Sequence, residues 1–234
     1  MAGAANDPPN AERPSGRIFA PGAPLRRPGA MAAFLLVAAA GLAADLWTKH
    51  AVFQSLLADP ALAPRVGLMV AEHGSQPPAE HVLRVLRLRR EVFPGFLLTL
   101  STNPGVVFGL PMPPWAVAIA TVFTIGLVGY FFASSPAAAR WVRAALAIIL
   151  AGALGNFYDR MLSATVVPGI DKPITGQVRD FLDFSEIRVF GLNYPYIFNV
   201  ADVLLVIGVA MLILHWTLAG RREKRAERAG RKTA

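Results

Sequence analysis

Four apolar runs of membrane length are the feature that most limits what this chain can fold into. A helix of about 20 apolar residues crosses the hydrocarbon core of a bilayer, and it satisfies its backbone polar groups internally. The third run is shorter, and it reaches across only if Arg140 and Arg143 extend toward the surface at its inner end. The pattern predicts an all-α membrane protein with four transmembrane helices. The runs cover residues 30 to 53, 115 to 133, 144 to 158 and 196 to 219.

The composition agrees with a membrane protein. Charged residues make up 16% of the chain, whereas soluble domains carry about 25%. The net charge is +8, but the basic residues gather beside the apolar runs, which fits membrane orientation better than a nucleic-acid groove. The chain has no cysteine, and its four histidines lack metal-ligand spacing. We therefore expect no disulfide, no cysteine nucleophile, no metal site and no nucleic-acid partner.

The arginines of the short loops predict the topology. They stand before the first run, between the second and third, and after the fourth, so both termini are expected in the cytoplasm and both long loops outside. The predicted parts are a disordered cytoplasmic extension (1–28), a four-helix membrane domain (29–220) and a basic cytoplasmic tail (221–234). The start also has features of a secretory signal, but no convincing cleavage site follows, which favours a retained anchor.

The outer segments predict a small amount of other structure. Apolar and basic residues interleave over 82–90, and 96–100 has strand character, so we expect a small extracytoplasmic antiparallel sheet. Residues 103–110 contain Pro104 and Gly105, which interrupt a helix and indicate either a plain turn or a re-entrant or lid loop. The stretch 178–184 alternates apolar and acidic residues and is expected to be a loop that returns to the membrane surface.

Asp202 lies inside the fourth run, where a carboxylate costs about 2.5 to 3.5 kcal/mol unless it is partnered or used. Asn199, three residues earlier, shares its face of a helix. In a helix that begins at residue 196, Asp202 would lie roughly 9 Å below the outer surface. The outer end of the third run is predicted at the same depth, with Asn156, Asp159 and Arg160.

Two neighbouring aspartates cannot both ionise at low cost, so one keeps a proton while the other acts as a base toward water. This is the chemistry of an aspartic peptidase. Asp45 and Lys49, four residues apart, form a favourable helical ion pair that either fixes the depth of the first helix or contacts substrate.

Five motifs in order resemble those of the bacterial lipoprotein signal peptidase family, signal peptidase II. Together with the four runs, the resemblance covers most of residues 30–220. The motifs are DLWTK (45–49), NPGVVF (103–108), GALGNFYDR (152–160), VRDF (178–181) and FNVAD (198–202).

The resemblance implies a peptidase of the bacterial inner membrane, with its active site at the outer face. It implies cleavage of prolipoproteins just before a cysteine that bears diacylglyceryl, by two aspartates without a cofactor, with membrane phospholipid as a further partner. By motif position the catalytic pair is Asp180 and Asp202, with Asp159 as competitor for the first place. The implied positioning and substrate-binding residues are Asp45, Lys49, Asn103, Gly105, Asn156, Asp159, Arg160, Asn199 and Ala201.

The chain departs from the family pattern in four places. Val106 and Val107 stand where two alanines are usual, and Arg179 replaces an apolar residue. Both outer loops are longer than usual, within 54–92 and 164–177.

Two other classes of protein are alternatives to a peptidase. An ion-coupled transporter needs polar residues through the full membrane thickness, whereas these acids gather at one end. A scaffold with structural ion pairs has no use for Asp180.

Overall fold

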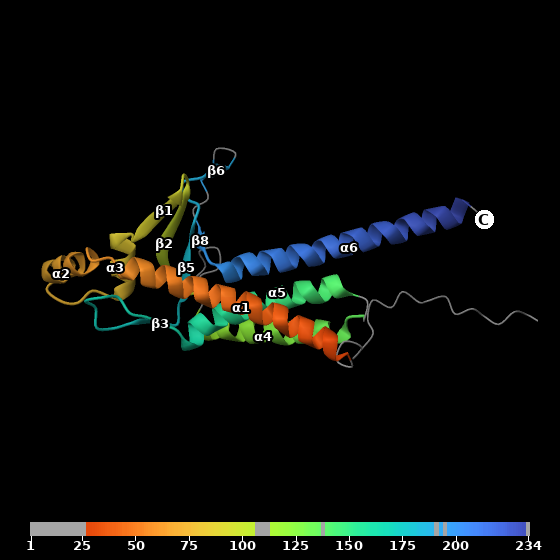
Figure 1. Cartoon of the computed structure of the whole chain (residues 1–234), viewed down its shortest axis with the longest axis horizontal. Coiled ribbons are helices and arrows are strands. Elements are labelled where there is room, and N and C mark those ends of the chain that lie inside the picture. Colours follow the sequence, from red (N-terminus) through yellow and green to blue (C-terminus); the bar gives the residue numbers. More distant parts are fainter. Residues whose placement is uncertain (1–26, 106–112, 137–138, 190–191, 194–195, 233–234) are drawn as a thin grey trace, which may run out of the picture.

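We describe the chain from a computed structural model, which covers residues 27–105, 113–136, 139–189, 192–193 and 196–232. Four helices lie along the long axis and are long and apolar enough to cross a membrane (Figure 1). The predicted extension, apart from its last two residues, lies outside the described residues, as do Val106 and Val107. The four helices are α1 (Pro28–Leu57), α4 (Pro114–Ser134), α5 (Arg140–Leu162) and α6 (Val200–Lys232).

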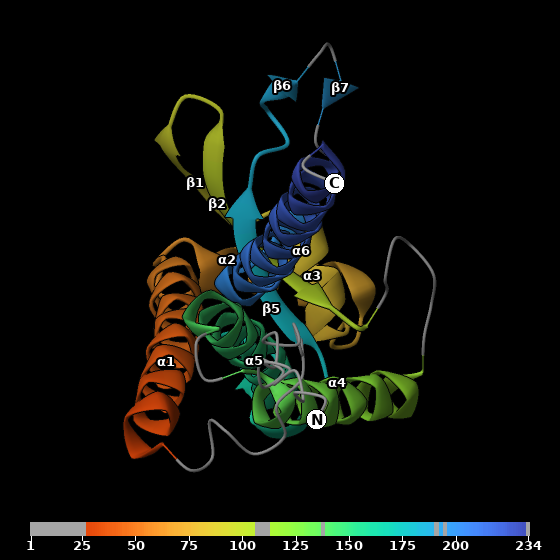
Figure 2. The ribbon, with the colours of Figure 1, turned by 90° about the vertical axis from the view of Figure 1, so that its right-hand side faces the viewer.

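Helix α5 lies at the centre of the bundle and contacts α1, α4 and α6 (Figure 2). Its small residues permit this close packing. A Cβ atom on Gly152 would collide with the backbone oxygen of Ala201, and one on Gly155 would collide with the carboxylate of Asp45. Small residues at helix interfaces let backbones approach closely in membranes, and here they bring three helices to the level at which the acidic residues lie.

A four-stranded antiparallel sheet stands at one end of the bundle, and it confirms the predicted small sheet (Figure 1). Its inner strands pair in a register that sets Ser101 opposite Asp180. The strand order is β1 (Arg89–Phe93), β2 (Phe96–Asn103), β5 (Val178–Asp183) and β8 (Ile197–Phe198). Two short antiparallel pairs are β3 (Ala164–Thr165) with β4 (Ile174–Thr175), and β6 (Arg188–Val189) with β7 (Leu192–Asn193).

Two short helices, α2 (Leu62–His73) and α3 (Ala79–Leu86), pack beyond the end of α1 (Figure 1). The strand predicted to begin at residue 82 is wrong, because α3 runs to Leu86 and β1 begins only at Arg89. Ala79, Val82 and Leu83 are buried in one core with Phe181 of β5. Their spacing is that of one face of a helix, and burial of this face decides the conformation.

Two other boundaries differ from the sequence expectation. Helix α6 begins at Val200 and not at residue 196, because residues 197 and 198 belong to β8. Asp202 therefore lies in the first turn of α6 and not 9 Å along it. The segment around Asp180 is the strand β5 and not an exposed loop, and Asp180 is only 3% exposed.

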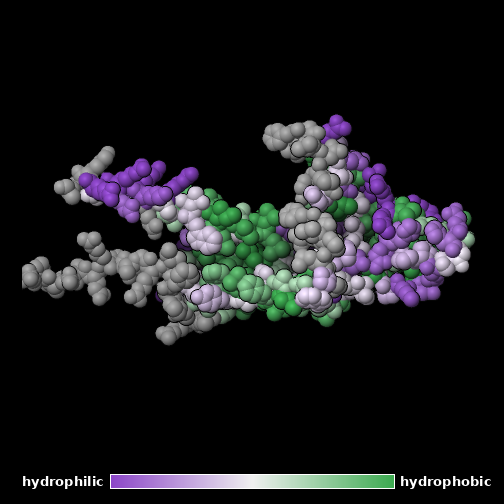
Figure 3. Space-filling view, turned by 180° about the vertical axis from the view of Figure 1, so that it is seen from behind, coloured by the Kyte–Doolittle hydropathy of each residue, from purple (hydrophilic) through white to green (hydrophobic). Residues whose placement is uncertain are grey.

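An apolar band separates two hydrophilic ends of the molecule (Figure 3). Large apolar side chains of α4 and α6, such as Phe123 and Val206, point outward and are 67% and 69% exposed. Such a belt is costly in water and favourable in lipid.

Candidate active site

The first turn of α6 is fixed by reciprocal hydrogen bonds between Asn199 and Asp202. The backbone N–H of Asp202 donates to Asn199 Oδ1 at 3.1 Å, and the backbone N–H of Asn199 donates to Asp202 Oδ2 at 3.1 Å. This arrangement is a capping box, which satisfies two N–H groups that a helix start leaves unpaired. It holds the half-buried Asp202 carboxylate in one orientation and leaves its Oδ1 atom for another partner.

Two amide side chains join Asp202 to Asp180. Asn199 Nδ2 donates to Asp180 Oδ1 at 2.6 Å and to Asn156 Oδ1 at 3.2 Å. Asn156 Nδ2 in turn donates to Asp202 Oδ1 at 2.8 Å. The bonds connect β5, the start of α6 and the last turns of α5, so three separate elements hold the two carboxylates near one another.

Burial raises the pKa of the Asp180 carboxyl to about 7, and the nearby negative charge of Asp202 adds to this rise. Hydrogen bonds from Asn199 and Asn103 act in the opposite direction but are smaller effects. Below about pH 7 the pair of carboxylates therefore holds one proton, which is the state that two adjacent carboxyls adopt when they cannot both ionise.

Beside this pair lies a second cluster in which every charge has an opposite partner. Lys49, with no exposed surface, donates to Asp45 Oδ2 at 2.8 Å and to Asn156 Oδ1 at 3.1 Å. Its ammonium also lies 3.0 Å from Asp159 Oδ2. Asp159 accepts hydrogen bonds from the guanidinium of Arg179 at 2.6 and 2.9 Å. The ammonium thus has three acceptors, which is what a buried lysine requires.

Asp45 and Asp159 also bind backbone groups of neighbouring elements. Asp45 Oδ1 accepts from the backbone N–H of Ala201, in the first turn of α6, at 2.8 Å. Asp159 Oδ2 accepts from the backbone N–H of Arg179, in β5, at 3.0 Å. The ion-pair cluster therefore ties α1 and α5 to the two elements that carry Asp202 and Asp180.

Arg160 has a different environment from Arg179. Its Nη1 donates to the backbone oxygen of Asn156 at 3.3 Å, whereas its buried Nε has no hydrogen-bond partner among the described residues. The guanidinium interacts electrostatically with Asp180 and Asp202. Arg160 is therefore a cation beside the carboxylate pair, and its Nε–H donor makes no hydrogen bond to the described residues.

The turn after β2 reaches the same site. The backbone N–H of Gly105 donates to Asn103 Oδ1 at 3.0 Å, and Gly105 has a φ of 103°, a conformation that favours glycine. The Asn103 side chain also hydrogen-bonds the carboxyl of Asp180. Both residues therefore belong to the neighbourhood of Asp180.

All eleven residues singled out from the sequence lie in or beside these two clusters. Arg179 was expected to act on a neighbouring carboxylate, but the sequence did not identify Asp159 as that carboxylate, nor the bond of Lys49 to Asn156 across 107 positions of the chain. Arg179 could be recognised from the sequence as a basic residue within an acidic motif. The bond of Lys49 to Asn156 could not be predicted, because the two residues are far apart in the sequence. Among the described residues, no group of three His, Cys, Asp or Glu side chains could hold a metal ion.

Comparison with known proteins was made for sequence and for structure. Residues 37–218 match the family signal peptidase (SPase) II. The lipoprotein signal peptidase of Shouchella clausii is 35% identical over 127 residues, which cover 54% of this chain and 72% of that protein. The one of Desulfitobacterium hafniense is 33% identical over 138 residues, covering 58% and 79%. A bacterial membrane enzyme solved at 1.9 Å is 25% identical, with a TM-score of 0.53, covering 80% of this chain and 93% of that one.

Proposed function

The chain belongs to the signal peptidase II family, and from this membership we propose that Asp180 and Asp202 are the catalytic pair of an aspartic endopeptidase. The enzyme removes signal peptides from prolipoproteins. The finer proposal is that it cuts just before a cysteine that already bears diacylglyceryl, and that it needs no cofactor.

The observation that carries the proposal is the asymmetry of the two carboxylates. Asp180 is buried with a pKa near 7, whereas Asp202 is half-buried at a helix start. We assign the resting proton to Asp180 and the role of base to Asp202. Asp202 takes a proton from a water molecule while the oxygen of that water forms a bond to the scissile carbonyl carbon. Asp180 gives its proton to the carbonyl oxygen.

Collapse of the tetrahedral intermediate completes the reaction. Asp180 recovers its proton from the intermediate as the carbonyl re-forms, and Asp202 passes its proton to the departing nitrogen as the C–N bond breaks. The products are a free carboxyl on the signal peptide and a free amine on the lipidated cysteine. Arg160, whose guanidinium interacts with both carboxylates, would help to position the pair and the substrate.

The remaining site residues position this pair. Asn156 and Asn199 bridge the two carboxylates. Asp45 anchors Ala201 in the first turn of α6, and Asp159 anchors β5 through Arg179. Lys49 neutralises both anchoring carboxylates. Asn103 and Gly105 would line the mouth of the site, and the lid or re-entrant loop expected over 103–110 lies, from residue 106 on, outside the described residues.

We further propose that the sheet and the site face the outside of the inner membrane. The starts of α1 and α5 and the basic C-terminal part of α6 all lie at the end of the long axis opposite the sheet (Figure 1), and Arg27 and Arg140 line one pocket there. Basic residues of short loops remain in the cytoplasm, so the sheet end is the outer one. In this arrangement 1–28 and 221–234 are the cytoplasmic extension and tail around the membrane domain 29–220, and the apolar band contacts phospholipid.

The alternative of an ion-coupled transporter receives no support from the placement of the charges. The charged clusters join α1, α5, β5 and the first turn of α6 at one end of the bundle. A proton or ion relay would need polar groups through the full thickness.

A cleavage assay with defined substrates tests the proposal. Purified protein in detergent is given two prolipoproteins that differ only in whether the cysteine bears diacylglyceryl, and the products are identified by mass spectrometry. We expect cleavage of the lipidated substrate alone, directly before the cysteine, unaffected by chelators. Equal cleavage of both substrates, or cleavage at another bond, would contradict the assigned specificity.

A further inference from the structure

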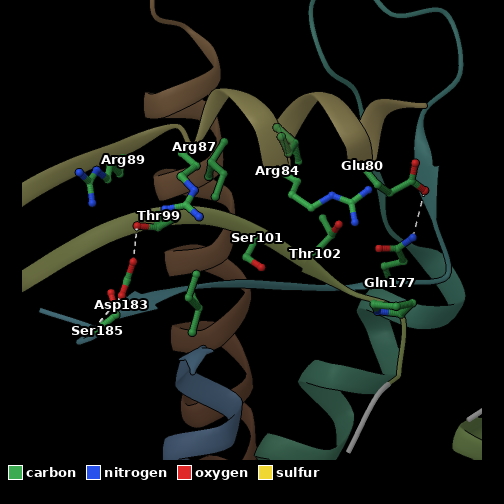
Figure 4. Close-up of a pocket in the computed structure, with 14 residues that line it drawn as sticks. Glu80, Arg84, Arg87, Arg89, Thr99, Ser101, Thr102, Gln177, Asp183 and Ser185 are labelled. Carbon is green, nitrogen blue, oxygen red and sulfur yellow. Dashed lines mark hydrogen bonds between the residues drawn. The ribbon is translucent and has the colours of Figure 1, made fainter. Parts of the chain in front are cut away.

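A groove of about 600 Å³ lies between α3 and the strands β2 and β5 (Figure 4). Successive side chains of a strand point to opposite faces, so Phe181 and Asp183 face away from Asp180. Asp183 lines the groove, and Phe181 packs in the core that includes α2 and α3. The groove is therefore on the face of the sheet opposite the catalytic pair.

The acidic groups of this groove are already satisfied. Asp183 accepts from Thr99 Oγ1 at 2.7 Å and from the backbone N–H of Ser185 at 2.9 Å. Although burial opposes it, these hydrogen bonds lower the pKa of the Asp183 carboxyl. Glu80 accepts from Gln177 Nε2 at 3.0 Å.

Of the three arginines that line the groove, Arg89 pairs with Glu186 at 3.1 Å, whereas Arg84 and Arg87 have no such partner among the described residues. Arg84 and Arg87 extend from the α3 side toward β2 (Figure 4). Neither guanidinium has a hydrogen bond or an ion pair among the described residues. Two forked donors beside the hydroxyl of Thr102 provide a surface that favours carboxylates on an extended chain.

The backbone at Arg87 gives a second, independent indication. Helix α2 is capped at its C-terminus by Gly74 with a φ of 65°, whereas α3 is capped by Arg87 with a φ of 43°. Arg87 is the only non-glycine residue with a positive φ in the described part of the chain. Glycine favours this position, so the backbone at Arg87 is locally strained, which points to a use for its side chain.

The groove begins where the catalytic site ends. Asn103 hydrogen-bonds Asp180, and the next residue, Pro104, lines the groove. From Thr99 to Pro104 the strand direction covers about 17 Å, enough for about five extended residues. A polypeptide that leaves the catalytic pair on the outer side can therefore continue along β2.

Aromatic side chains mark the other face of the sheet as the one toward lipid. Phe184 stacks on Phe96 and Phe198 with ring centroids 4.7 and 5.6 Å apart. By strand register these rings share the face of Asp180. The groove on the opposite face is thus directed away from the bilayer, which favours a peptide ligand over a phospholipid headgroup.

We propose that this groove binds acidic residues in the first stretch of the mature lipoprotein, just after the cleavage site. The inference rests on the proposed function and adds a substrate preference to it. Lipoproteins with Asp or Glu in that stretch would be held by Arg84 and Arg87 while the scissile bond reaches the catalytic pair.

The test compares two lipidated prolipoproteins that differ only in the residues that follow the cysteine, acidic in one and the corresponding amides in the other. We expect the wild type to favour the acidic substrate at least fivefold in kcat/KM, mainly through KM. In R84Q/R87G this ratio falls to about one. Since glycine suits the backbone at position 87, the thermal stability of the double variant should not fall. The control is R90Q/R188Q, which removes the same charge outside the groove and keeps the preference.

The outcomes separate the inference from the proposed function. A wild type that cleaves both substrates equally, or a double variant that keeps the preference, overturns the inference alone. A wild type that cleaves neither substrate contradicts the proposed function. Binding of the free acidic peptide, measured by fluorescence anisotropy, then shows whether the groove binds acidic residues. If the double variant slows both substrates equally and only in vesicles with anionic lipid, the groove binds headgroups and the peptide proposal is wrong.

Discussion

Two groups of buried acids lie side by side, and they differ in what surrounds them. Asp45 and Asp159 share the ammonium of Lys49, and Asp159 also holds Arg179. Asp180 and Asp202 are linked through amide side chains, and among the described residues neither carboxylate forms an ion pair. In the first group both carboxylates are neutralised by cations, so the group stabilises the fold. In the second, burial and the charge of Asp202 raise the pKa of Asp180 despite the nearby guanidinium of Arg160, so a proton is retained below about pH 7. The same residue type thus serves either structure or chemistry, depending on its partners.

The largest effect is expected from removing the base of the second group. D202N should lower kcat by about 10³-fold or more, because no other carboxylate is placed to take the proton from water. The amide preserves the shape and the acceptor for the Asn199 N–H but loses the acceptor for Asn156 Nδ2, so the thermal unfolding temperature should fall only slightly. The measurement is single-turnover cleavage of a lipidated substrate, with D171N, an exposed aspartate outside both groups, as the control. Activity of D202N near the level of the control would remove Asp202 from the reaction.

Removing the cation from the first group should affect folding most. K49M leaves Asp45 and Asp159 buried without their shared partner, and breaking a buried ion pair in this way costs about 3 to 5 kcal/mol. We expect a clearly lower unfolding temperature and less protein in the membrane, measured by thermal unfolding in detergent. K224M on the C-terminal part of α6 is the matched control. Normal stability of K49M would show that the cluster does not support the fold.

Crowding between α5 and α1 should give an intermediate effect. G155A places a methyl group against the Asp45 carboxylate, and overpacking of this kind costs about 1 to 3 kcal/mol. G67A in α2 has open space around the new methyl group and should be neutral or stabilising by up to about 1 kcal/mol. The two unfolding temperatures should move in opposite directions. Equal shifts would mean that the packing at Gly155 is not limiting.

The proton on Asp180 predicts the smallest but most specific effect. Its pKa is raised in the folded protein to about 7, so kcat/KM should fall by about tenfold per pH unit well above pH 7. The raised pKa also means that the folded state binds the proton more tightly than the unfolded state, so stability is lost as pH rises through 7. The unfolding temperature of D180N relative to wild type should therefore increase between pH 5 and 8. A constant difference over that range would contradict the pKa assignment.

The sequence was a good guide to the helices and a poorer one to the end of the molecule that carries the sheet. A long apolar run in a bilayer must satisfy its backbone polar groups internally and therefore forms a helix, which is why α1, α4 and α5 lie where predicted. The segment of α3 alternates Val, Leu and Arg in a way that also fits a strand, and tertiary burial of one helical face decides between them. Asp180 was expected in a loop because strand pairing with β2, some 80 positions earlier, has no local signal.

The motif residues were identified correctly as neighbours, but their contacts were not. Pairs within one turn, such as Asp45 with Lys49 and Asn199 with Asp202, follow from helical spacing. Contacts between elements do not, and these include the bond of Asp45 to the Ala201 backbone and that of Arg179 to Asp159. The division of the acids into two groups is therefore a result of the fold.

The most direct test of this division compares D180N with D159N at matched protein levels, with turnover per folded molecule and unfolding temperature measured on the same samples. The account predicts that D180N is inactive and at least as stable as wild type at pH 8. It predicts that D159N unfolds at a lower temperature, while its remaining folded molecules still cleave substrate. An inactive but stable D159N together with an active D180N would contradict the account and move the catalytic pair to α5 and α6.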